Sequence, residues 1–360
     1  MKKTDVGILG ATGVVGQRYV QLLADHPWFR VSFVAASPRS SGKTYEEAVA
    51  GRWLMTGDIP AAVKRLRVYD AGDARAAGDH CRAVFSAVSL PKPAVRELEE
   101  TYAAIGLPVI SNNSAHRVTA DVPVLIPEIN AHHLALIPIQ QSRQGWSTGF
   151  IVVKPNCSIQ SYMTPLDALR RADMPVKQAV ISTMQGISGA GYPGVAAFDL
   201  VDNLVPYISG EEEKSEQEPQ KIFGQIGKEG VVPDTSLKLS VHCNRVSVID
   251  GHTACVSLQF ENKAPPVDEI RMVFAQYRAL PQELALPSAP INPIVVRPEA
   301  DRPQPRRDRD ADKGMAVSVG RIRACPVLDV RFVGLSHNTI RGAAGGGILN
   351  AELLKARGYL

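Results

Sequence analysis

One cysteine in the sequence stands in a setting suited to nucleophilic chemistry. Cys157 lies in VVKPNCSIQS at residues 152–161, after a short apolar run and before a helix-like segment at residues 162–170. We expect it near a helix N-terminus, where unpaired amides and the helix dipole stabilise the thiolate, the form that attacks an activated acyl carbon. A lone cysteine is more often a small buried hydrophobic residue, but the polar neighbours Asn156 and Ser158 favour the nucleophile.

The other four cysteines lack this setting, since Cys255 lies within an apolar alternation and Cys325 precedes a proline. An odd, scattered set without a CxxC pair argues against a disulfide framework and against a structural zinc site. We therefore predict no metal site, and expect most of Cys81, Cys243, Cys255 and Cys325 to be reduced core residues.

Two further groups of polar residues could serve such a nucleophile. Arg245 and His252 bracket the stretch VSVIDG, and a bend at Asp250–Gly251 would let His252 act as a general acid or base while Arg245 grips a carboxylate. A histidine after a glycine turn is more often structural. The run EEEKSEQE at residues 211–218 resembles a charged first helical turn, for which a solvated face is the simpler interpretation.

The N-terminal part has the pattern of a nucleotide site. An apolar run at residues 5–9 enters GATGVVG, where Gly10, Gly13 and Gly16 would let the backbone approach a pyrophosphate at the N-terminus of the following helix. The spacing GxxGxxG differs from GxGxxG, so a packing role stays open. The other expected cofactor-binding residues of this turn and of the later strand are Thr12, Val14, Val15 and Ser86.

The loop after a second expected strand, residues 30–36, indicates which dinucleotide binds. Ser37, Arg39, Ser40 and Lys43 offer hydroxyls and cations where an acidic residue would bond a ribose 2′-hydroxyl. NADP is therefore expected rather than NAD, although Arg39 and Lys43 could equally be ordinary surface charges.

The order of these patterns predicts an α/β chain of two domains. Apolar runs at residues 83–88 and 108–111 continue the alternation of strand and helix, which favours a parallel, doubly wound Rossmann-type domain over residues 1–150. Residues 151–337 read as an α+β domain, and the apolar helix within residues 338–360 is expected to return to the first domain. The charged, proline-rich tract at residues 297–313 is expected to be a solvated loop.

Length and composition agree with this organisation. The 360 residues allow two sizeable cores, and 45% hydrophobic with 21% charged residues is ordinary for a globular protein. The start MKKTDVGILGATG leaves no room for a signal peptide, and no apolar run approaches the roughly 20 residues of a membrane span, so we expect a soluble cytoplasmic protein. The net charge of +4 is small and unclustered, which argues against nucleic acid as a partner but leaves small anionic substrates open.

Six motifs, in order over nearly the whole chain, resemble the aspartate-semialdehyde dehydrogenase family. They are GATGVVG at 10–16, PNCS at 155–158, QGISGAG at 185–191, EEEK at 211–214, RVSVIDGHT at 245–253 and NTIRGAAGGG at 338–347. GMAVSVGRIR at residues 314–323 looks closer to the archaeal and fungal branch than to the Gram-negative one, whereas Lys154 and the tract at residues 297–313 lie outside the pattern.

The resemblance implies NADPH-dependent conversion of L-aspartyl-4-phosphate to L-aspartate 4-semialdehyde through a cysteine thioester, on the way to lysine, threonine and methionine. It implies a second domain of the glyceraldehyde-3-phosphate-dehydrogenase-like kind, for catalysis and dimerisation, in a homodimer or homotetramer. The implied catalytic residues are Cys157 as nucleophile, Gln185 as the residue that orients the acyl group, and His252 as acid/base. Arg245 would hold the substrate α-carboxylate, Glu211 its α-ammonium, and Lys214 and Arg117, assisted by Asn113, its phosphate, with Ser188, Gly189 and Asn338 beside the nicotinamide.

Three alternatives remain open on the sequence. N-acetylglutamyl-phosphate reductase shares the fold and mechanism, but its substrate nitrogen is an uncharged amide that would leave Glu211 poorly paired. A malonyl-CoA reductase would need room for coenzyme A. A non-catalytic NADP-binding regulator on this fold would have no need of Cys157, His252 and Arg245 together.

Overall fold

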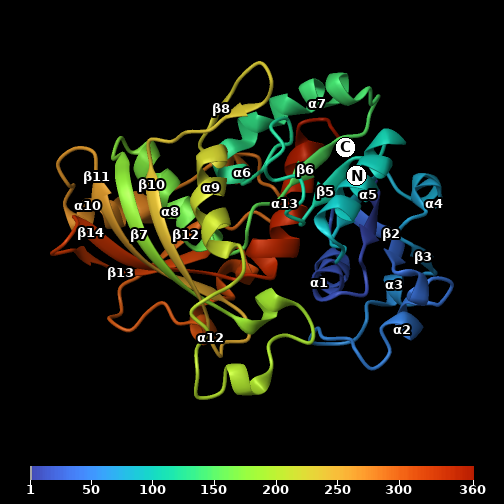
Figure 1. Cartoon of the computed structure of the whole chain (residues 1–360), viewed down its shortest axis with the longest axis horizontal. Helices are drawn as coiled ribbons and strands as arrows, with labels where there is room; N and C mark the ends of the chain where they lie inside the picture. The colour runs from blue at the N-terminus through green and yellow to red at the C-terminus, as the bar shows by residue number, and fades with distance from the viewer. Residues whose placement is uncertain (1) are drawn as a thin grey trace.

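The computed structural model describes residues 2–360, which form two six-stranded sheets with helices packed against them (Figure 1). All neighbouring strands of the first sheet are parallel, in the order β3-β2-β1-β4-β5-β6. The strands are β1 (Thr4–Leu9), β2 (Phe29–Ala36), β3 (Val68–Asp70), β4 (Ala83–Ser86), β5 (Val109–Ser111) and β6 (Ile151–Val153). The order reverses between β1 and β4, the point where such sheets bind ligands beyond their carboxyl ends. The predicted Rossmann-type fold is therefore confirmed.

Helices cover both faces of this sheet, which explains why its central strands are nearly continuous apolar runs rather than alternating ones. The helices of this part are α1 (Val14–Leu23), α2 (Tyr45–Ala48), α3 (Ala61–Lys64), α4 (Ala74–His80), α5 (Lys92–Ala104), α6 (Pro127–Asn130) and α7 (Leu136–Gln144). Its last strand, β6, pairs with β5, so the sheet extends past the boundary predicted at residue 150. The apolar run before Cys157 was expected, but only its pairing with β5 assigns it to the first sheet.

The C-terminal helix α13 (Gly345–Ala356) returns to the first sheet. It follows a π-helical turn at Ile340–Ala344 and contacts α1 and β5. Ile348 and Leu353 belong to the same hydrophobic core as β1 and β2. The last helix of the chain therefore packs against the first sheet.

The second sheet is mixed, with the order β10-β7-β11-β14-β13-β12. Its strands are β7 (Val176–Gln185), β10 (Lys238–Arg245), β11 (His252–Phe260), β12 (Ile294–Arg297), β13 (Val317–Ala324) and β14 (Val330–Ser336). The remaining elements are α8 (Gln160–Arg171), α9 (Glu211–Ile222), α10 (Val267–Gln276), α11 (Leu280–Glu283), α12 (Pro305–Asp308) and the short pair β8 (Gln225–Ile226) and β9 (Val231–Val232). The helices α8 and α10 pack on one face of this sheet.

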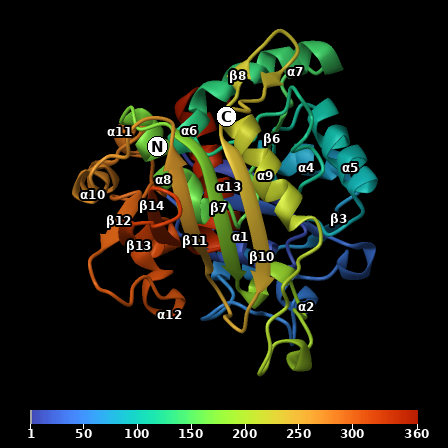
Figure 2. The same cartoon turned by 60° about the vertical axis from the view of Figure 1, so that its left-hand side comes forward.

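The opposite face of the second sheet is uncovered, and Figure 2 shows β10, β7 and β11 with this face toward the viewer. Residues alternate along each strand, so that Ile181 is buried beneath α8 while Val180 is 50% exposed on the open face. Cys255 is exposed here and Cys325 is partly exposed, whereas Cys81 and Cys243 are buried. The expectation of core cysteines is therefore wrong for two of them, because Cys255 lies on the open face and Cys325 in the turn between β13 and β14.

The tract at residues 297–313 is only partly the solvated loop that was predicted. Asp308 is buried and pairs with Arg302 and, at 2.8 Å, with Arg297. Arg309 donates a hydrogen bond of 3.0 Å to the carbonyl of Asp250, just before His252. Some charges of this tract therefore bind one another and the neighbouring turn, while Glu299, Arg306 and Asp310 remain exposed.

Within residues 2–360, no helix combines the length and the apolar character that crossing a bilayer requires. No three histidine, cysteine or carboxylate side chains of that range are grouped as metal ligands. Two cavities contain residues predicted from the sequence, one along the carboxyl edge of the first sheet and one between the two sheets.

Close contact between α13 and α1 makes Gly347 necessary to the fold. A methyl group at Gly347 would overlap the hydroxyl of Tyr19, a fully buried side chain that has no room to move. We expect Gly347→Ala to lower the free energy of unfolding by about 1–3 kcal/mol, the usual cost of overpacking. Urea titration followed by circular dichroism measures the effect.

Gly78→Ala in α4 is the matched control, since a methyl group there would meet only Ile105, at 3.9 Å. It should raise stability by about 0.5–1 kcal/mol, because alanine favours a helix over glycine. Equal effects of the two substitutions would contradict the proposed contact.

Candidate active site

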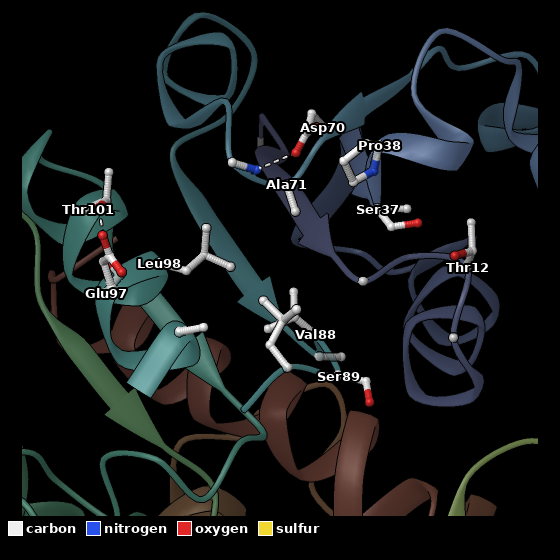
Figure 3. Close-up of a pocket in the computed structure, with 17 residues that line it drawn as sticks. Thr12, Ser37, Pro38, Asp70, Ala71, Val88, Ser89, Glu97, Leu98 and Thr101 are labelled. Carbon is white, nitrogen blue, oxygen red and sulfur yellow. Dashed lines mark hydrogen bonds between the residues drawn. The ribbon is translucent and has the colours of Figure 1, made fainter. Parts of the chain in front are cut away.

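A cavity of about 560 Å³ opens at the carboxyl ends of β1, β2 and β4 (Figure 3). Thr12, Ser37 and Pro38 line one side of it, and Leu98 and Thr101 of α5 line the other. Residue 13, the N-cap of α1, has no side chain to bond the amides of the first helical turn. These amides are therefore free to bind an anion such as a pyrophosphate.

The cofactor-binding residues predicted from the sequence divide into three groups. Those that line this cavity are Gly10, Thr12, Gly13 and Ser37, while Val14 and Val15 line the neighbouring one. Gly10 has a φ of 78°, and Gly16 lies so close to the Gly10 carbonyl that a side chain would not fit. The residues outside the lining of both cavities are Gly16, Arg39, Ser40, Lys43 and Ser86, of which Ser40 and Ser86 are buried.

A second cavity of about 390 Å³ contains Cys157 and lies between the two sheets. It shares Ala87, Val88 and Ser89, which follow β4, with the first cavity. Its other predicted residues are Asn113, Arg117, Ser188, Gly189, Glu211, Lys214 and Asn338. A dinucleotide in the first cavity would therefore extend toward the sulfur through the shared segment.

The Cys157 sulfur faces a histidine, as the chemistry predicted from the sequence requires. Its Sγ lies 3.4 Å from Nε2 of His252, and Nδ1 of the same ring accepts a hydrogen bond of 3.0 Å from the amide of Gly186. A nitrogen that accepts an N–H bond carries no proton, so the neutral ring has its proton on Nε2, directed at the sulfur. Burial lowers the pKa of His252 to about 4, with a smaller opposing effect from the Gly251 backbone and a further lowering by Arg245.

Strand register places three of the predicted residues in one row. Gln185 at the end of β7 pairs with Arg245 on β10 and with His252 on β11. Arg245 and His252 are thus neighbours on either side of β7 rather than partners in a hairpin. Gln185 is buried, and its amide donates to the Thr183 hydroxyl at 3.3 Å.

The loop at residues 186–191 covers this row. Arg245 donates a bond of 2.7 Å to the carbonyl of Gly186, and a side chain at Gly189 would lie 2.9 Å from the guanidinium. Asn338, just after β14 of the same sheet, fixes the loop, because it donates to the Ser188 hydroxyl and accepts from the backbone amide of Gly251, each at 2.8 Å. Glycine is needed at 189 for the loop to close over Arg245.

The charged run at residues 211–218 is the first part of helix α9, as predicted, and it faces the cavity. Glu211 accepts hydrogen bonds of 2.9 Å from the side-chain amide of Asn156 and from Nζ of Lys214. Burial alone would raise the pKa of Glu211, but Lys214 and Asn156 hold it below its ordinary value. The carboxylate is therefore ionised at neutral pH, in a position to accept a cationic group.

Two residues of the site were not predicted from the sequence. Asn156 was noted only as a polar neighbour of Cys157, and Glu218 only as part of the charged run. Glu218 pairs with Arg117 at 2.9 Å and accepts a hydrogen bond of 2.6 Å from the backbone N–H of Asn156. Its spacing of seven residues from Glu211 on a predicted helix was the available signal, since such residues share a helix face. Asn113 lines the cavity, but its side-chain amide donates to Ser86 and to the buried carboxylate Glu99.

The surroundings of Cys157 do not favour the thiolate in the way that the sequence suggested. Burial raises the pKa of its thiol, Glu211 adds to the rise, and Lys154, Arg117 and Arg245 oppose it. Helix α8 begins at Gln160, slightly nearer to Cys157 than the sequence predicted. Lys154, Arg117 and Arg245 are the nearby cations that favour the thiolate.

Comparison with known proteins agrees with this geometry. Models of the semialdehyde dehydrogenase NAD binding domain and dimerisation domain match residues 5–137 and 166–341. The chain is similar to the aspartate-semialdehyde dehydrogenases of Methanothermobacter thermautotrophicus (46% identity over 97% of this chain and 98% of the other) and Schizosaccharomyces pombe (43%, 99% of each). It is also similar to the solved structure of the Candida albicans enzyme with NADP, with a TM-score of 0.90 and 40% identity over 100% of both chains. The predicted resemblance, including the archaeal and fungal branch, is confirmed.

We expect His252 to remain neutral between pH 5 and pH 8, with its proton on Nε2. The reason is that burial lowers its pKa to about 4, so protonation would begin only below this range. Nitrogen-15 NMR of the histidine rings measures both the protonation state and the tautomer, with His252→Asn to assign the signal. A protonated Nδ1 at pH 7 would contradict the hydrogen bond from Gly186.

Proposed function

The chain belongs to the aspartate-semialdehyde dehydrogenase family, and we propose that Cys157 is the nucleophile of its reaction. The enzyme is an NADP-dependent oxidoreductase that converts L-aspartyl-4-phosphate to L-aspartate 4-semialdehyde and phosphate, a step toward lysine, threonine and methionine. The observation that carries the assignment of Cys157 is its contact with His252 at 3.4 Å inside a cavity lined by cations.

Two charges opposite Cys157 match the two charges of an amino acid. Arg245 uses one N–H on the carbonyl of Gly186, which leaves further donors of its guanidinium for a bidentate grip on the substrate α-carboxylate. Glu211 is partly buried and ionised, so it can accept an α-ammonium group in addition to Lys214. We assign these roles to the two residues because each would face a substrate group of opposite charge.

Arg117 and Lys214 are the cations that we assign to the substrate phosphate. Both line the cavity, and Nε of Arg117 is buried without a hydrogen-bond partner. Their pairs with Glu218 and Glu211 fix the two side chains without using all of their donors. Asn113 forms part of the cavity wall, and its side-chain amide already donates a hydrogen bond to Ser86.

The reaction proceeds in two stages at the same sulfur. The Cys157 thiolate attacks the acyl carbon, a C–S bond forms, and the C–O bond to phosphate breaks, which leaves a thioester. Gln185 lies next to His252 in the row and is assigned to orient the acyl group. The Nε2–H of His252 faces the reacting sulfur, where it can bond the oxygen that becomes negative in each tetrahedral state.

The residues around the first cavity fit a dinucleotide phosphate. The free amides at the start of α1 suit the pyrophosphate, and Ser37 follows β2 where the 2′-phosphate of the adenosine ribose would lie. Bound NADPH supplies the hydride that reduces the thioester to the aldehyde. Ser188, Gly189 and Asn338, which line the cavity beside Cys157, are assigned to the nicotinamide end.

The alternative substrates are less suited to this site. The relatives reported above are named aspartate-semialdehyde dehydrogenases, which favours aspartyl phosphate as the substrate. An N-acetyl group would also leave the ionised Glu211 facing a neutral amide.

We further propose that the enzyme works as a homodimer or homotetramer, with a second copy on the open face of the second sheet. Val180 and Cys255 are exposed on that face. The segment at residues 192–207, the yellow-green projection at the bottom of Figure 1, adds apolar surface, including Phe198 with 96% exposure. Apolar surface of this extent is typical of an interface between subunits.

A cytoplasmic location is also proposed. All five cysteines are free. Free thiols, one of them catalytic, suit a reducing compartment.

We expect Cys157→Ala to abolish phosphate-dependent reduction of NADP by aspartate semialdehyde. The rate should fall by at least ~1,000-fold, because no other group can form the thioester. Absorbance of NADPH measures the reaction. Cys325→Ala, in the turn between β13 and β14, should keep full activity, and comparable activity in both variants would remove Cys157 from the mechanism.

We expect Arg39→Ala to weaken NADPH much more than NADH. Loss of a charged hydrogen bond to the 2′-phosphate should raise the KM for NADPH by about tenfold, equivalent to ~1.4 kcal/mol. Steady-state kinetics with both cofactors measure the difference. Lys64→Ala removes an exposed cation at the end of α3, paired with Glu46 at 3.3 Å, and should change neither KM. Equal effects of Arg39→Ala on both cofactors would exclude the 2′-phosphate role.

A further inference from the structure

Glu99 on helix α5 is a fully buried carboxyl group outside the catalytic cavity, and no step of the reaction above uses it. Its side chain is 0% exposed, and within residues 2–360 no lysine or arginine forms an ion pair with it. The titratable group beside it is His116, whose Nε2 lies 3.9 Å from Oε2. Burial, and next Arg96, lower the pKa of His116 to about 4, so this ring is neutral at neutral pH and provides no opposite charge. A carboxyl group buried in this way must be retained for its hydrogen bonds.

The hydrogen bonds of Glu99 all lead to Asn113. Its Oε1 accepts from the Ser111 hydroxyl at 2.7 Å and from the side-chain amide of Asn113 at 3.0 Å. A hydroxyl has a single proton, so the Ser111 proton that points to Glu99 leaves the lone pairs for another donor. That donor is the backbone N–H of Asn113, at 3.0 Å. Glu99 therefore fixes the side chain of Asn113 directly and its backbone through Ser111.

The backbone fixed in this way supports Arg117. The carbonyl of Asn112 accepts a hydrogen bond of 3.0 Å from Nη2 of Arg117. This carbonyl and the N–H of Asn113 belong to one peptide group, which is planar. The Ser111 hydroxyl on the N–H side therefore determines the direction of the carbonyl that Arg117 bonds.

Arg117 needs this second support to keep one orientation. Its Nη1 bonds Glu218 of α9 at 2.9 Å, and its Nη2 bonds the Asn112 carbonyl. Two contacts fix a planar guanidinium group, whereas one contact leaves it free to turn. Asn112, Asn113 and Arg117 all line the cavity that contains Cys157, so a change behind this loop reaches the site.

A carboxyl group can lie behind an anion site only if it adds little negative charge there. Burial raises the pKa of Glu99, while hydrogen bonds from Ser86, Asn113 and Ser111 oppose the rise. Both of the hydrogen bonds described above reach Oε1, and in the described part of the chain no donor bonds Oε2. Oε2 can therefore carry a proton without loss of either hydrogen bond.

We propose that Glu99 is a positioning residue for the substrate phosphate, which it orients through Ser111, the peptide group between Asn112 and Asn113, and the guanidinium of Arg117. Glu99 touches no substrate atom and acts only through this chain of hydrogen bonds. The inference rests on the proposed role of Arg117 as a phosphate-binding residue.

The test is steady-state kinetics in the direction of aspartate semialdehyde oxidation, with separate KM values for inorganic phosphate, aspartate semialdehyde and NADP. Glu99→Met keeps a side chain of similar length but removes the acceptor. We expect it to raise the KM for phosphate about tenfold, the usual effect of a lost buried hydrogen-bond acceptor. The KM values for aspartate semialdehyde and NADP should stay within about twofold, because their binding residues do not depend on the Asn112 carbonyl.

Two variants separate this role from a general effect on the fold. Glu99→Gln keeps an acceptor oxygen in place of Oε1 and should hold the KM for phosphate within about twofold of the unchanged enzyme. Glu352→Met removes another fully buried carboxyl group, bonded to His26 and to the amide of Ser288, and should leave the KM for phosphate unchanged.

Ser111→Ala removes the hydroxyl that joins Glu99 to the peptide group and replaces Glu99→Met if that variant does not fold; we expect a rise of about fivefold in the same KM. An unchanged KM for phosphate in the folded variant, or an equal rise in all three KM values, overturns the proposal.

Arg117→Ala tests the underlying assignment by itself. An unchanged KM for phosphate in Arg117→Ala would remove Arg117 from the phosphate site. A raised KM in Arg117→Ala together with an unchanged KM in Glu99→Met would leave that assignment intact and overturn only the role of Glu99.

Discussion

The pairing of buried charges between the two sheets is the constraint on which the site depends. The buried or half-buried pairs are Arg117 with Glu218, Arg341 with Glu128, and Lys214 with Glu211. Removal of one member of a buried pair costs about 3–5 kcal/mol, because its partner is left as an unpaired charge in a poor solvent. The cations that face the substrate are therefore fixed before it binds, and little rearrangement of charge is needed during the reaction.

The second sheet fixes the catalytic side chains relative to one another, since its hydrogen-bond ladder determines which residues lie side by side. Arg245, Gln185 and His252 occupy one row across three strands, and a shift of one residue in β7 would turn Gln185 toward the open face. The strand positions also explain why the residues that bind and reduce the substrate come from distant parts of the chain. The row becomes a site only where it meets Cys157 before α8.

The sequence sufficed for the glycine turn, the parallel sheet and the chemical partners Cys157 and His252, because motifs and apolar runs carry these directly. It could not supply the direction of a hydrogen bond, so the role of Glu218 and the tautomer of His252 emerged only from distances. The expected thiolate at a helix N-terminus was also overestimated, since burial is a property of the whole fold. The tract at residues 297–313 was partly misread because some of its charges find partners in one another, which composition does not reveal.

Three glycines of the motif at residues 338–347 make room for side chains from other parts of the chain. Gly342 admits the Cβ of Cys157, Gly346 admits the stem of Lys154, and Gly347 admits the ring of Tyr19 from the nucleotide-binding helix α1. At Gly342 and Gly347 the nearest atom to a missing side chain comes from another element, whereas at Gly346 it is the Arg341 carbonyl of the same helix, with Lys154 next. The same segment begins with Asn338, which bonds the loop over the catalytic row. One helix therefore fixes the nucleophile, its neighbouring lysine and the cofactor helix relative to one another, and this is how two separate sheets form one active site.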